Sequence, residues 1–327
     1  MSKAVQDQFV RAVALHQQGK LQEAQSLYES ILKQQPKHAD ALHLLGVICQ
    51  QAGQPDRAVQ LIGQAITLNP KEVGYYINRG NALQSLGRLE EAVVSFEQAI
   101  RLRPSIPEAH FNLGNALQGL DKLEPALSSF NQAIRLKPDY ADAYNNRGRV
   151  QQSLQKLDQA LGSYDQAIRH VPNHAQAWNN RGLVLKAQGH HQSAKESFER
   201  ALLLRPNYAE AWKNHGDVLL DLQQPQAAVE SFDRALHFKP QYAEAYNNRG
   251  NALLMLNRAE AAVASYDQSI QVRPDYPEAW SNRGNALQQL KQYQLAIESY
   301  DRSLQFNPDY PEAWNNRGNA QLAIIRL

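Results

Sequence analysis

The feature that most constrains this chain is a repeat of 34 residues that runs along nearly its whole length. A glycine, an alanine and a proline each recur at this spacing, and no insertion or deletion breaks the frame. The glycines are Gly46, Gly80, Gly114, Gly148, Gly182, Gly216, Gly250, Gly284 and Gly318. A strict period of this length predicts copies of one small structural unit, each of which buries its apolar face against its neighbours.

Each copy is predicted to form two helices joined by a short turn. In residues 73–106, apolar residues recur at helical spacing in two runs, which are separated by the Gly-Arg-Leu-Glu sequence of residues 87–90. We number positions from Ala39 as position 1 of its repeat. The proline at position 32 ends the second helix, because its ring lacks an N–H and clashes with the preceding turn. Acidic residues at position 2 match the positive end of the first helix dipole. The pattern therefore predicts an all-α fold.

The recurring residues also resemble a known family. Glycine at position 8, alanine at 20, an aromatic residue usually at 24, a small residue at 27 and proline at 32 are typical of the tetratricopeptide repeat (TPR). This resemblance implies a TPR solenoid, which is a right-handed superhelix of antiparallel helix pairs. It implies a single array over 1–327, with a divergent repeat at 5–38, eight full repeats at 39–310 and a half repeat, the first helix alone, at 311–327.

Composition argues against several functional classes. The 34 basic and 32 acidic residues leave a formal net charge of +2, which gives no electrostatic footprint for nucleic acid. The sequence has no apolar stretch near 18 residues and no apolar signal segment at its start, so we expect no membrane span. The single cysteine fits a reducing compartment, and we expect a cytoplasmic protein. Motifs for catalysis, phosphate binding or metal binding are absent, so we expect no enzyme, no cofactor and no metal.

Asparagine recurs on the predicted first helices. Position 6 is asparagine in eight consecutive repeats, and position 9 on the same face is often asparagine too. The position 6 series is Asn78, Asn112, Asn146, Asn180, Asn214, Asn248, Asn282 and Asn316, and the position 9 series includes Asn81, Asn115, Asn251 and Asn285. Asparagine is a mediocre helix former, so its retention needs a reason. An amide offers both donor and acceptor, which complements the backbone of an extended peptide. The alternative is that duplication copied one ancestral asparagine that caps or packs.

An apolar patch is predicted beside these amides in the early repeats, formed by Val47, Ile77 and Phe111. This patch either holds the side chains of a ligand or packs against the neighbouring helix.

The asparagine series resembles that of the TPR region of O-linked N-acetylglucosamine transferase-like bacterial proteins, in which such residues hold the backbone of extended substrates. The resemblance implies a protein–protein interaction scaffold that binds extended polypeptide segments in a concave groove. The alternative is the substrate-recruiting portion of a larger glycosyltransferase of that kind, whose catalytic domain is absent here.

Position 7 is arginine in most repeats, and position 25 of the same repeat is then acidic, as in Arg79 with Glu97 and Arg249 with Asp267. The two repeats with leucine at position 7 lack that acid. This matching predicts a salt bridge between the two helices of one repeat, and predicts that Arg317 has no partner. The aromatic residues at position 4 are expected to pack between repeats.

The last repeat is still in frame at Leu327. We expect either that the array continues in a longer protein, or that another copy of the chain or a partner helix covers this end. Self-association through the C-terminal end is therefore a further alternative.

Overall fold

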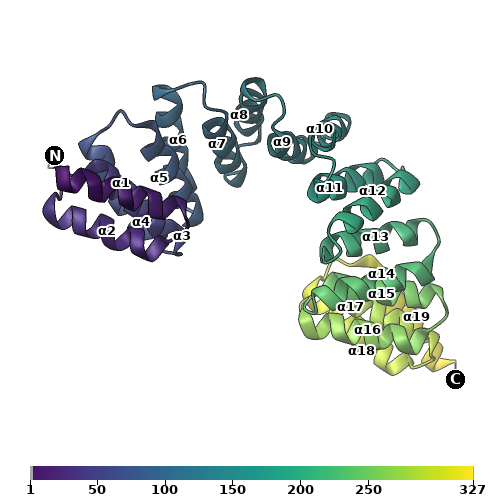
Figure 1. Ribbon diagram of the computed structural model, residues 1–327. Coiled ribbons are helices and arrows are strands. Elements are labelled where there is room, and N and C mark those ends of the chain that lie inside the picture. Colours follow the sequence, from purple (N-terminus) through teal and green to yellow (C-terminus); the bar gives the residue numbers. More distant parts are fainter. Residues whose placement is uncertain (1–2, 327) are drawn as a thin grey trace. The chain divides into compact units, whose positions relative to one another are not determined.

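The computed structural model describes residues 3–326, which form nineteen α-helices and no strands (Figure 1). Odd-numbered helices are the first helices of the repeats, and even-numbered helices are the second. The first helices are α1 (Lys3–Gln17), α3 (Ala39–Gln51), α5 (Val73–Ser85), α7 (Pro107–Gly119), α9 (Ala141–Ser153), α11 (Ala175–Ala187), α13 (Ala209–Asp221), α15 (Ala243–Met255), α17 (Pro277–Gln289) and α19 (Pro311–Ile325). The second helices are α2 (Leu21–Gln34), α4 (Pro55–Leu68), α6 (Leu89–Leu102), α8 (Leu123–Leu136), α10 (Leu157–His170), α12 (His191–Leu204), α14 (Pro225–Phe238), α16 (Ala259–Val272) and α18 (Tyr293–Phe306). The predicted all-α class is confirmed.

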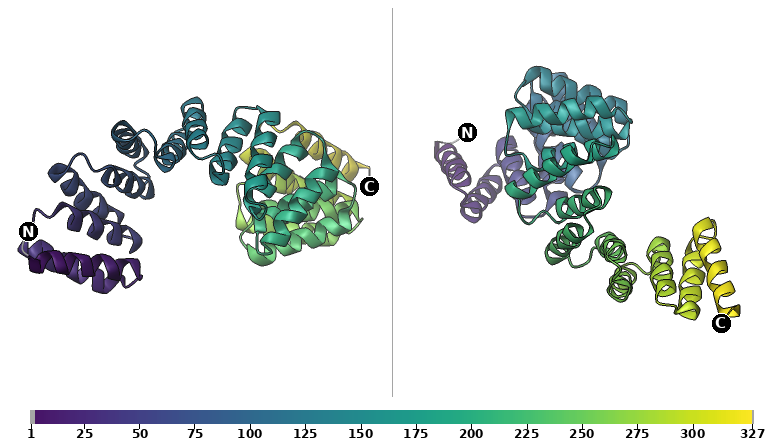
Figure 2. Two further views of the ribbon diagram at one scale, coloured as in Figure 1. Left: turned by 45° about the horizontal axis from the view of Figure 1, so that its top comes forward. Right: turned by 90° about the vertical axis from the view of Figure 1, so that its right-hand side faces the viewer.

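The helices fall into two compact units, Met1–His170 and Val171–Leu327. We call them the N-terminal unit and the C-terminal unit. Within each unit, a first helix packs against the second helix that follows it, and that second helix packs against the next first helix (Figures 1 and 2). Each unit is thus held together by contacts between helices that are close in the sequence.

In the eight full repeats at 39–310, the core forms where glycine at position 8 meets a large side chain at position 24. A Cβ atom added to Gly284 would lie 2.5 Å from Cε1 of Tyr300, whose side chain is fully buried. The ring therefore occupies the space that any other residue would need for its side chain. Gly46 differs only in that Ile62 takes the place of the ring, at 2.7 Å.

The turn between the two helices of a repeat has one residue in the left-handed region, at position 15. Glycine takes this conformation in four repeats, for example Gly87 at φ 71°. Five other repeats place a residue with a side chain there, for example Gln155 at φ 58° and Asn257 at φ 57°. Left-handed backbone costs about 1–2 kcal/mol for most L-residues, so the helix packing on both sides determines this turn more strongly than its own residue does.

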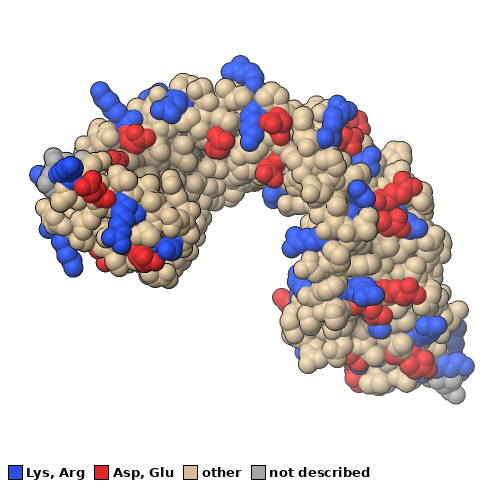
Figure 3. Space-filling view, in the orientation of Figure 1, with Lys and Arg blue, Asp and Glu red and all other residues tan. Residues whose placement is uncertain are grey.

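Among the described residues, no helix combines the length and the hydropathy that crossing a membrane requires. On the face shown in Figure 3, basic and acidic side chains are interspersed over both units.

Candidate functional site

The predicted asparagines lie on the first helices, and the structure joins them in a series of hydrogen bonds between consecutive repeats. In three places, Nδ2 at position 6 donates to Oδ1 of the position 9 asparagine in the preceding repeat. These bonds join Asn112 to Asn81 at 3.0 Å, Asn146 to Asn115 at 2.8 Å and Asn316 to Asn285 at 2.9 Å. Asn248 makes the equivalent bond to Asp217 at 2.7 Å. We call this series the amide ladder.

Position 5 supplies the acceptor in other repeats. Asn214 donates to Asn179 at 3.1 Å, and Asn282 donates to Asn247 at 3.0 Å. The two acceptors, Asn179 and Asn247, are buried. They were not predicted as part of the site, although the recurrence of asparagine at position 5 was a usable signal. Asn179 also donates to Oδ1 of Asn180 at 3.5 Å. The ladder is therefore a structural link between repeats, whatever else it binds.

The first rung of the ladder involves a histidine. Nδ2 of Asn78 lies 2.7 Å from Nε2 of His43, so the ring nitrogen accepts when the histidine is neutral. Burial lowers the pKa of His43 to about 4, against the smaller opposing influence of Asp40 and Glu72. This rung consequently belongs to the neutral form of the ring.

The rungs differ in how far a ligand could reach them. Asn214 and Asn180 are 5% and 9% exposed, whereas the other six position 6 asparagines are half-buried. Each Nδ2 carries two hydrogens and each Oδ1 can accept twice. A rung with one bond to its neighbour therefore keeps further hydrogen-bonding capacity.

Two cavities open on the ladder, one in each unit. The cavity of the N-terminal unit has a volume of about 490 Å³ and lies between α7 and α9. It is lined by Asn115, Gln118, Gly119, Asp121, Leu123, Asn146, Arg149 and Ser153. The cavity of the C-terminal unit has a volume of about 380 Å³ and is lined by Asn285, Gln288, Gln289 and Asn316. Both cavities are thus bordered by positions 6, 9, 12 and 13 of consecutive first helices.

Position 9 also contacts the core. The hydroxyl of Tyr266 donates to Asn251 at 2.7 Å, and the hydroxyl of Tyr300 donates to Asn285 at 2.8 Å. Burial raises the pKa of both tyrosines. Since the rings are fully buried, these bonds fix the amides from behind.

The predicted apolar patch is half-buried. The Phe111 ring centroid lies 4.9 Å from that of Tyr140 and 5.9 Å from that of Phe130. Ile77 packs against a small cluster around Val73. Both side chains thus contribute to packing between helices, and Val47 is half-buried on α3.

One repeat replaces neutral amides with charges. Nζ of Lys213, at position 5, lies 2.8 Å from Oδ2 of Asp217, at position 9. Near the C-terminal ends of α11 and α13, Nζ of Lys186 lies 3.4 Å from Oδ2 of Asp221. The ladder of the C-terminal unit is therefore neutral near Asn285 and ionic near Asp217.

The prediction that a position 7 arginine pairs with an acid of its own repeat is wrong for Arg249 and Arg283. Nε of Arg249 contacts Asp233 at 2.6 Å and Nε of Arg283 contacts Asp267 at 2.6 Å, so each acid belongs to the preceding repeat. Arg317, which we expected to lack a partner, contacts Asp301 at 2.5 Å.

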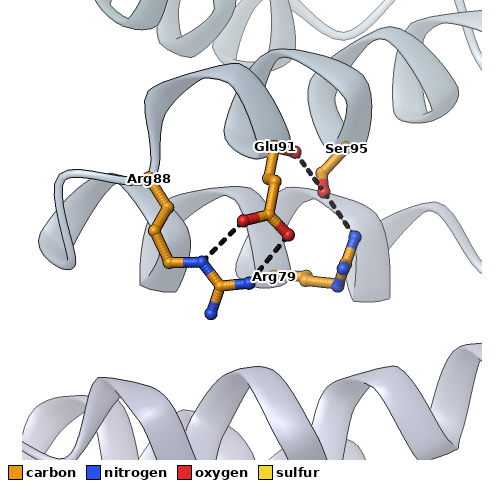
Figure 4. Close-up of polar contacts among 4 residues, drawn as sticks. All are labelled: Arg79, Arg88, Glu91 and Ser95. Atoms are coloured by element: carbon orange, nitrogen blue, oxygen red, sulfur yellow. Dashed lines mark hydrogen bonds and ion pairs between the residues drawn. The ribbon is translucent and has the colours of Figure 1, made fainter.

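Within its own repeat, the position 7 arginine donates to a serine at position 23. In Figure 4, Nη1 of Arg79 donates to Ser95 at 3.0 Å, while the nearby Glu91 pairs with Arg88 of the turn. Arg249 and Arg283 thus contact both the second helix of their own repeat and the acid of the preceding one.

The position 4 residues form a further link of this kind. Nε1 of Trp178, Trp280 and Trp314 donates to the carbonyl of Pro172, Pro274 and Pro308 at 2.8–3.0 Å. Each acceptor is the position 32 proline of the preceding repeat, just beyond its second helix. This contact agrees with the expected role in packing between repeats.

Comparison with known proteins bears on the family. Models described as tetratricopeptide repeat match residues 15–76, 139–207, 182–243, 213–277 and 277–310, and a model described as TPR repeat matches 80–121 and 120–155. No curated protein matches significantly.

Solved structures share the fold at low identity. YrrB, described as a TPR protein with an unusual peptide-binding site, is 24% identical, with a TM-score of 0.51. The matched region is 59% of this chain and 99% of YrrB. A chain of the APC/C hetero-tetramer Cut9-Hcn1 is 17% identical, with a TM-score of 0.62. The matched region is 92% of this chain and 59% of that chain. Pseudomonas aeruginosa pilF is 22% identical, with a TM-score of 0.57. The matched region is 63% of this chain and 94% of pilF. These matches do not support the glycosyltransferase alternative.

Proposed function

The chain belongs to the tetratricopeptide-repeat family, and we propose that it is an interaction scaffold that binds extended polypeptide segments along its amide ladder. The binding is non-catalytic, and the segments belong to other proteins. The single observation that carries the proposal is the pair of cavities that open on the ladder, one in each unit.

The chemistry of the cavity walls favours a peptide backbone. Each of the four residues that line the cavity of the C-terminal unit, Asn285, Gln288, Gln289 and Asn316, carries a side-chain amide. An extended peptide presents alternating N–H and C=O groups, and side-chain amides supply a partner for each. Neutral donors of this kind select a backbone without selecting a charge.

The bonds within the ladder support it as a preorganised surface. Asn146 and Asn316 each donate one bond from Nδ2 to the preceding repeat, and Asn146 also accepts a bond from Asn145 at 3.1 Å. A ligand that uses their remaining hydrogens and lone pairs loses little side-chain entropy, because these rotamers are already fixed. We propose these two asparagines, with Asn115 and Asn285, as the main contacts. The buried Asn180 and Asn214 contribute less.

Two glutamines test the proposal without damaging the ladder. Gln118 is half-buried and Gln289 is exposed, and each lines one cavity. Random peptides of about a dozen residues are first selected by phage display on the wild-type protein, and one selected peptide is then labelled for anisotropy titration. Loss of one hydrogen bond costs roughly 0.5–1.5 kcal/mol, which corresponds to about two- to twelve-fold in Kd. Gln118→Ala or Gln289→Ala is expected to weaken binding by that factor.

The matched control is Asn173→Ala, which removes an exposed amide from a turn outside both cavities. Its Kd should equal that of the wild type. The proposal is wrong if both cavity variants bind the selected peptide as tightly as the control does.

A further inference from the structure

One repeat of the C-terminal unit has a shorter side chain at position 7. The repeats on both sides of α13 have arginine there, whereas α13 has His215. In five repeats the arginine donates to a serine at position 23. Figure 4 shows that this serine can donate its own proton to a backbone carbonyl, as Ser95 does to Glu91. His215 takes the place of the arginine in this arrangement.

The hydrogen bonds of His215 determine which ring nitrogen carries the proton. Nδ1 of His215 lies 3.0 Å from the hydroxyl of Ser231, and that hydroxyl donates to the carbonyl of Ala227 at 2.9 Å. A hydroxyl has one hydrogen, so Ser231 accepts from Nδ1–H. Burial lowers the pKa of His215, against the smaller opposing influence of Glu199, and so favours the neutral ring. Nε2 of the neutral ring is consequently a hydrogen-bond acceptor.

Two acceptors lie close together beside this ring. Nε2 of His215 is buried and has no hydrogen-bond partner among the described residues. Oε1 of Glu199, at position 25 of the preceding repeat, lies 3.7 Å from Nε2, which is too far for a hydrogen bond. In later repeats the corresponding acids, Asp233 and Asp267, accept from the Nε atom of an arginine at 2.6 Å. The surroundings of His215 thus retain the acceptors of an arginine site.

A cavity of about 400 Å³ is bordered by both His215 and Glu199. Its walls come from α12, α13 and α14, and they include the indole of Trp212 at position 4. In the preceding repeat, the guanidinium carbon of Arg181 lies 5.8 Å from the centroid of the Trp178 ring, within the range of a cation–π contact. Trp212 has the same ring at the same position, which adds a third feature of an arginine site.

A guanidinium matches these three features better than other charged groups do. It is planar and carries five N–H donors in a fixed fork, so it can bond two acceptors while one face lies on an aromatic ring. An ammonium is a compact, strongly hydrated charge without such a face. A carboxylate would place a third acceptor beside the other two. Lys195 and Arg234 also border the cavity, but Glu199 and Glu230 balance their charge, so the walls do not favour an anion.

We propose that this cavity binds the guanidinium of an arginine side chain from a partner protein, which donates to Nε2 of His215 and to the Glu199 carboxylate. The bound group would make the contacts that the position 7 arginine makes in the neighbouring repeats. The site is separate from the proposed peptide-binding ladder, because the residues that border it border neither ladder cavity.

The probe is N-acetyl-arginine methylamide, which is titrated into the full chain. Binding is followed by NMR through the ring nitrogens of His215 and the indole N–H of Trp212. Saturable binding is expected, with a shift of the Nε2 signal because that nitrogen gains a donor. The capped citrulline, whose urea has the same shape without the charge, and the capped lysine should each bind at least about tenfold more weakly. Equal binding by either analogue would overturn the proposal, because the cavity would then not select a guanidinium.

His215→Arg supplies the guanidinium from the chain itself, with the residue that both neighbouring repeats already have at position 7. Folding should therefore be retained, as circular dichroism can check, and probe binding at the Trp212 indole should fall at least about tenfold. Equal binding by His215→Arg and wild type would overturn the proposal.

Glu199→Gln tests the second acceptor and should weaken binding about fivefold or more, because a charge-assisted bond to a half-exposed carboxylate is lost. Glu196→Gln makes the same change at an exposed site on the same helix outside the cavity, and should bind as the wild type does. Equal binding by the two variants would contradict the role of Glu199. Tighter binding of the capped glutamate than of the capped arginine would overturn the proposal in favour of an anion site at Lys195 and Arg234.

Discussion

At the scale of single residues, the same residue type has different roles at equivalent positions. Gly284 is required because the fully buried Tyr300 ring occupies its side-chain space, whereas Gly318 faces open space. The two glycines therefore form a natural matched pair, which separates packing from helix propensity.

Gly284→Ala is expected to lower the free energy of unfolding by about 1–3 kcal/mol, because the new methyl group overpacks a closed core. Gly318→Ala is expected to raise it by up to about 1 kcal/mol, because alanine is the better helix former. Denaturant unfolding monitored by circular dichroism measures both. The packing argument is wrong if the two variants change stability in the same direction.

His43 is expected to make the free energy of unfolding depend on pH. Its pKa is about 4 in the folded chain, against about 6.5 when unfolded, so the unfolded state binds more protons between these values. The contribution of His43 to stability is therefore complete above about pH 6.5 and is lost as the pH falls towards 4, by up to about 3 kcal/mol. Unfolding of wild type and His43→Asn is compared over this range. The difference between the two curves should change with pH, and taking this difference removes the effects of the other titrating groups, which both proteins share.

The sequence was sufficient for the helices and insufficient for several partners. Periodic glycine and proline located every helix pair, because each residue type reports a local steric requirement. The acid of Arg249 was assigned to the wrong repeat, because in a periodic array Asp233 and Asp267 have the same residue type. The sequence left open whether the position 6 asparagines bind a ligand or pack, because the bonds within the amide ladder depend on the distance between neighbouring first helices. Pattern alone does not supply that distance.

At the scale of helices, three kinds of contact join first helices to the preceding repeat. These are the amide ladder, the bond from the position 4 ring to the position 32 carbonyl, and the arginine at position 7 with its acid. The last pair is partly exposed, since Arg249 and Asp233 side chains are 29% and 51% exposed. Its contribution is consequently small, and its value lies in fixing which helices are adjacent.

A double-mutant cycle distinguishes the two possible partners. Arg249 and Asp233 are expected to couple by about 0.2–1 kcal/mol, and the coupling should shrink at high salt. Arg249 and Asp267 should show no measurable coupling. Alanine substitutions, singly and in pairs, with unfolding free energies at low and high salt, provide both cycles. Coupling to Asp267 alone would restore the original assignment within one repeat.

At the scale of the whole molecule, the contacts run between helices that are close in sequence, as expected for a repeat protein whose stability is a sum of local terms. Damage to one repeat should therefore spread to its neighbours and then fade. Hydrogen exchange of Gly284→Ala is expected to rise in α17 and α18, less in α16 and α19, and to stay unchanged in α3 and α4. Uniform acceleration across all helices would instead indicate one cooperative unit.

The links between repeats also have a direction. In each rung, and in each ring-to-proline and arginine-to-acid contact described above, the donor lies in the later repeat and the acceptor in the earlier one. Synthesis on the ribosome proceeds in that same order, and domains form from the N-terminal side first. The acceptors that join a first helix to the preceding repeat are thus already made when that helix leaves the ribosome. These links can form before the second helix of the new repeat has been synthesised.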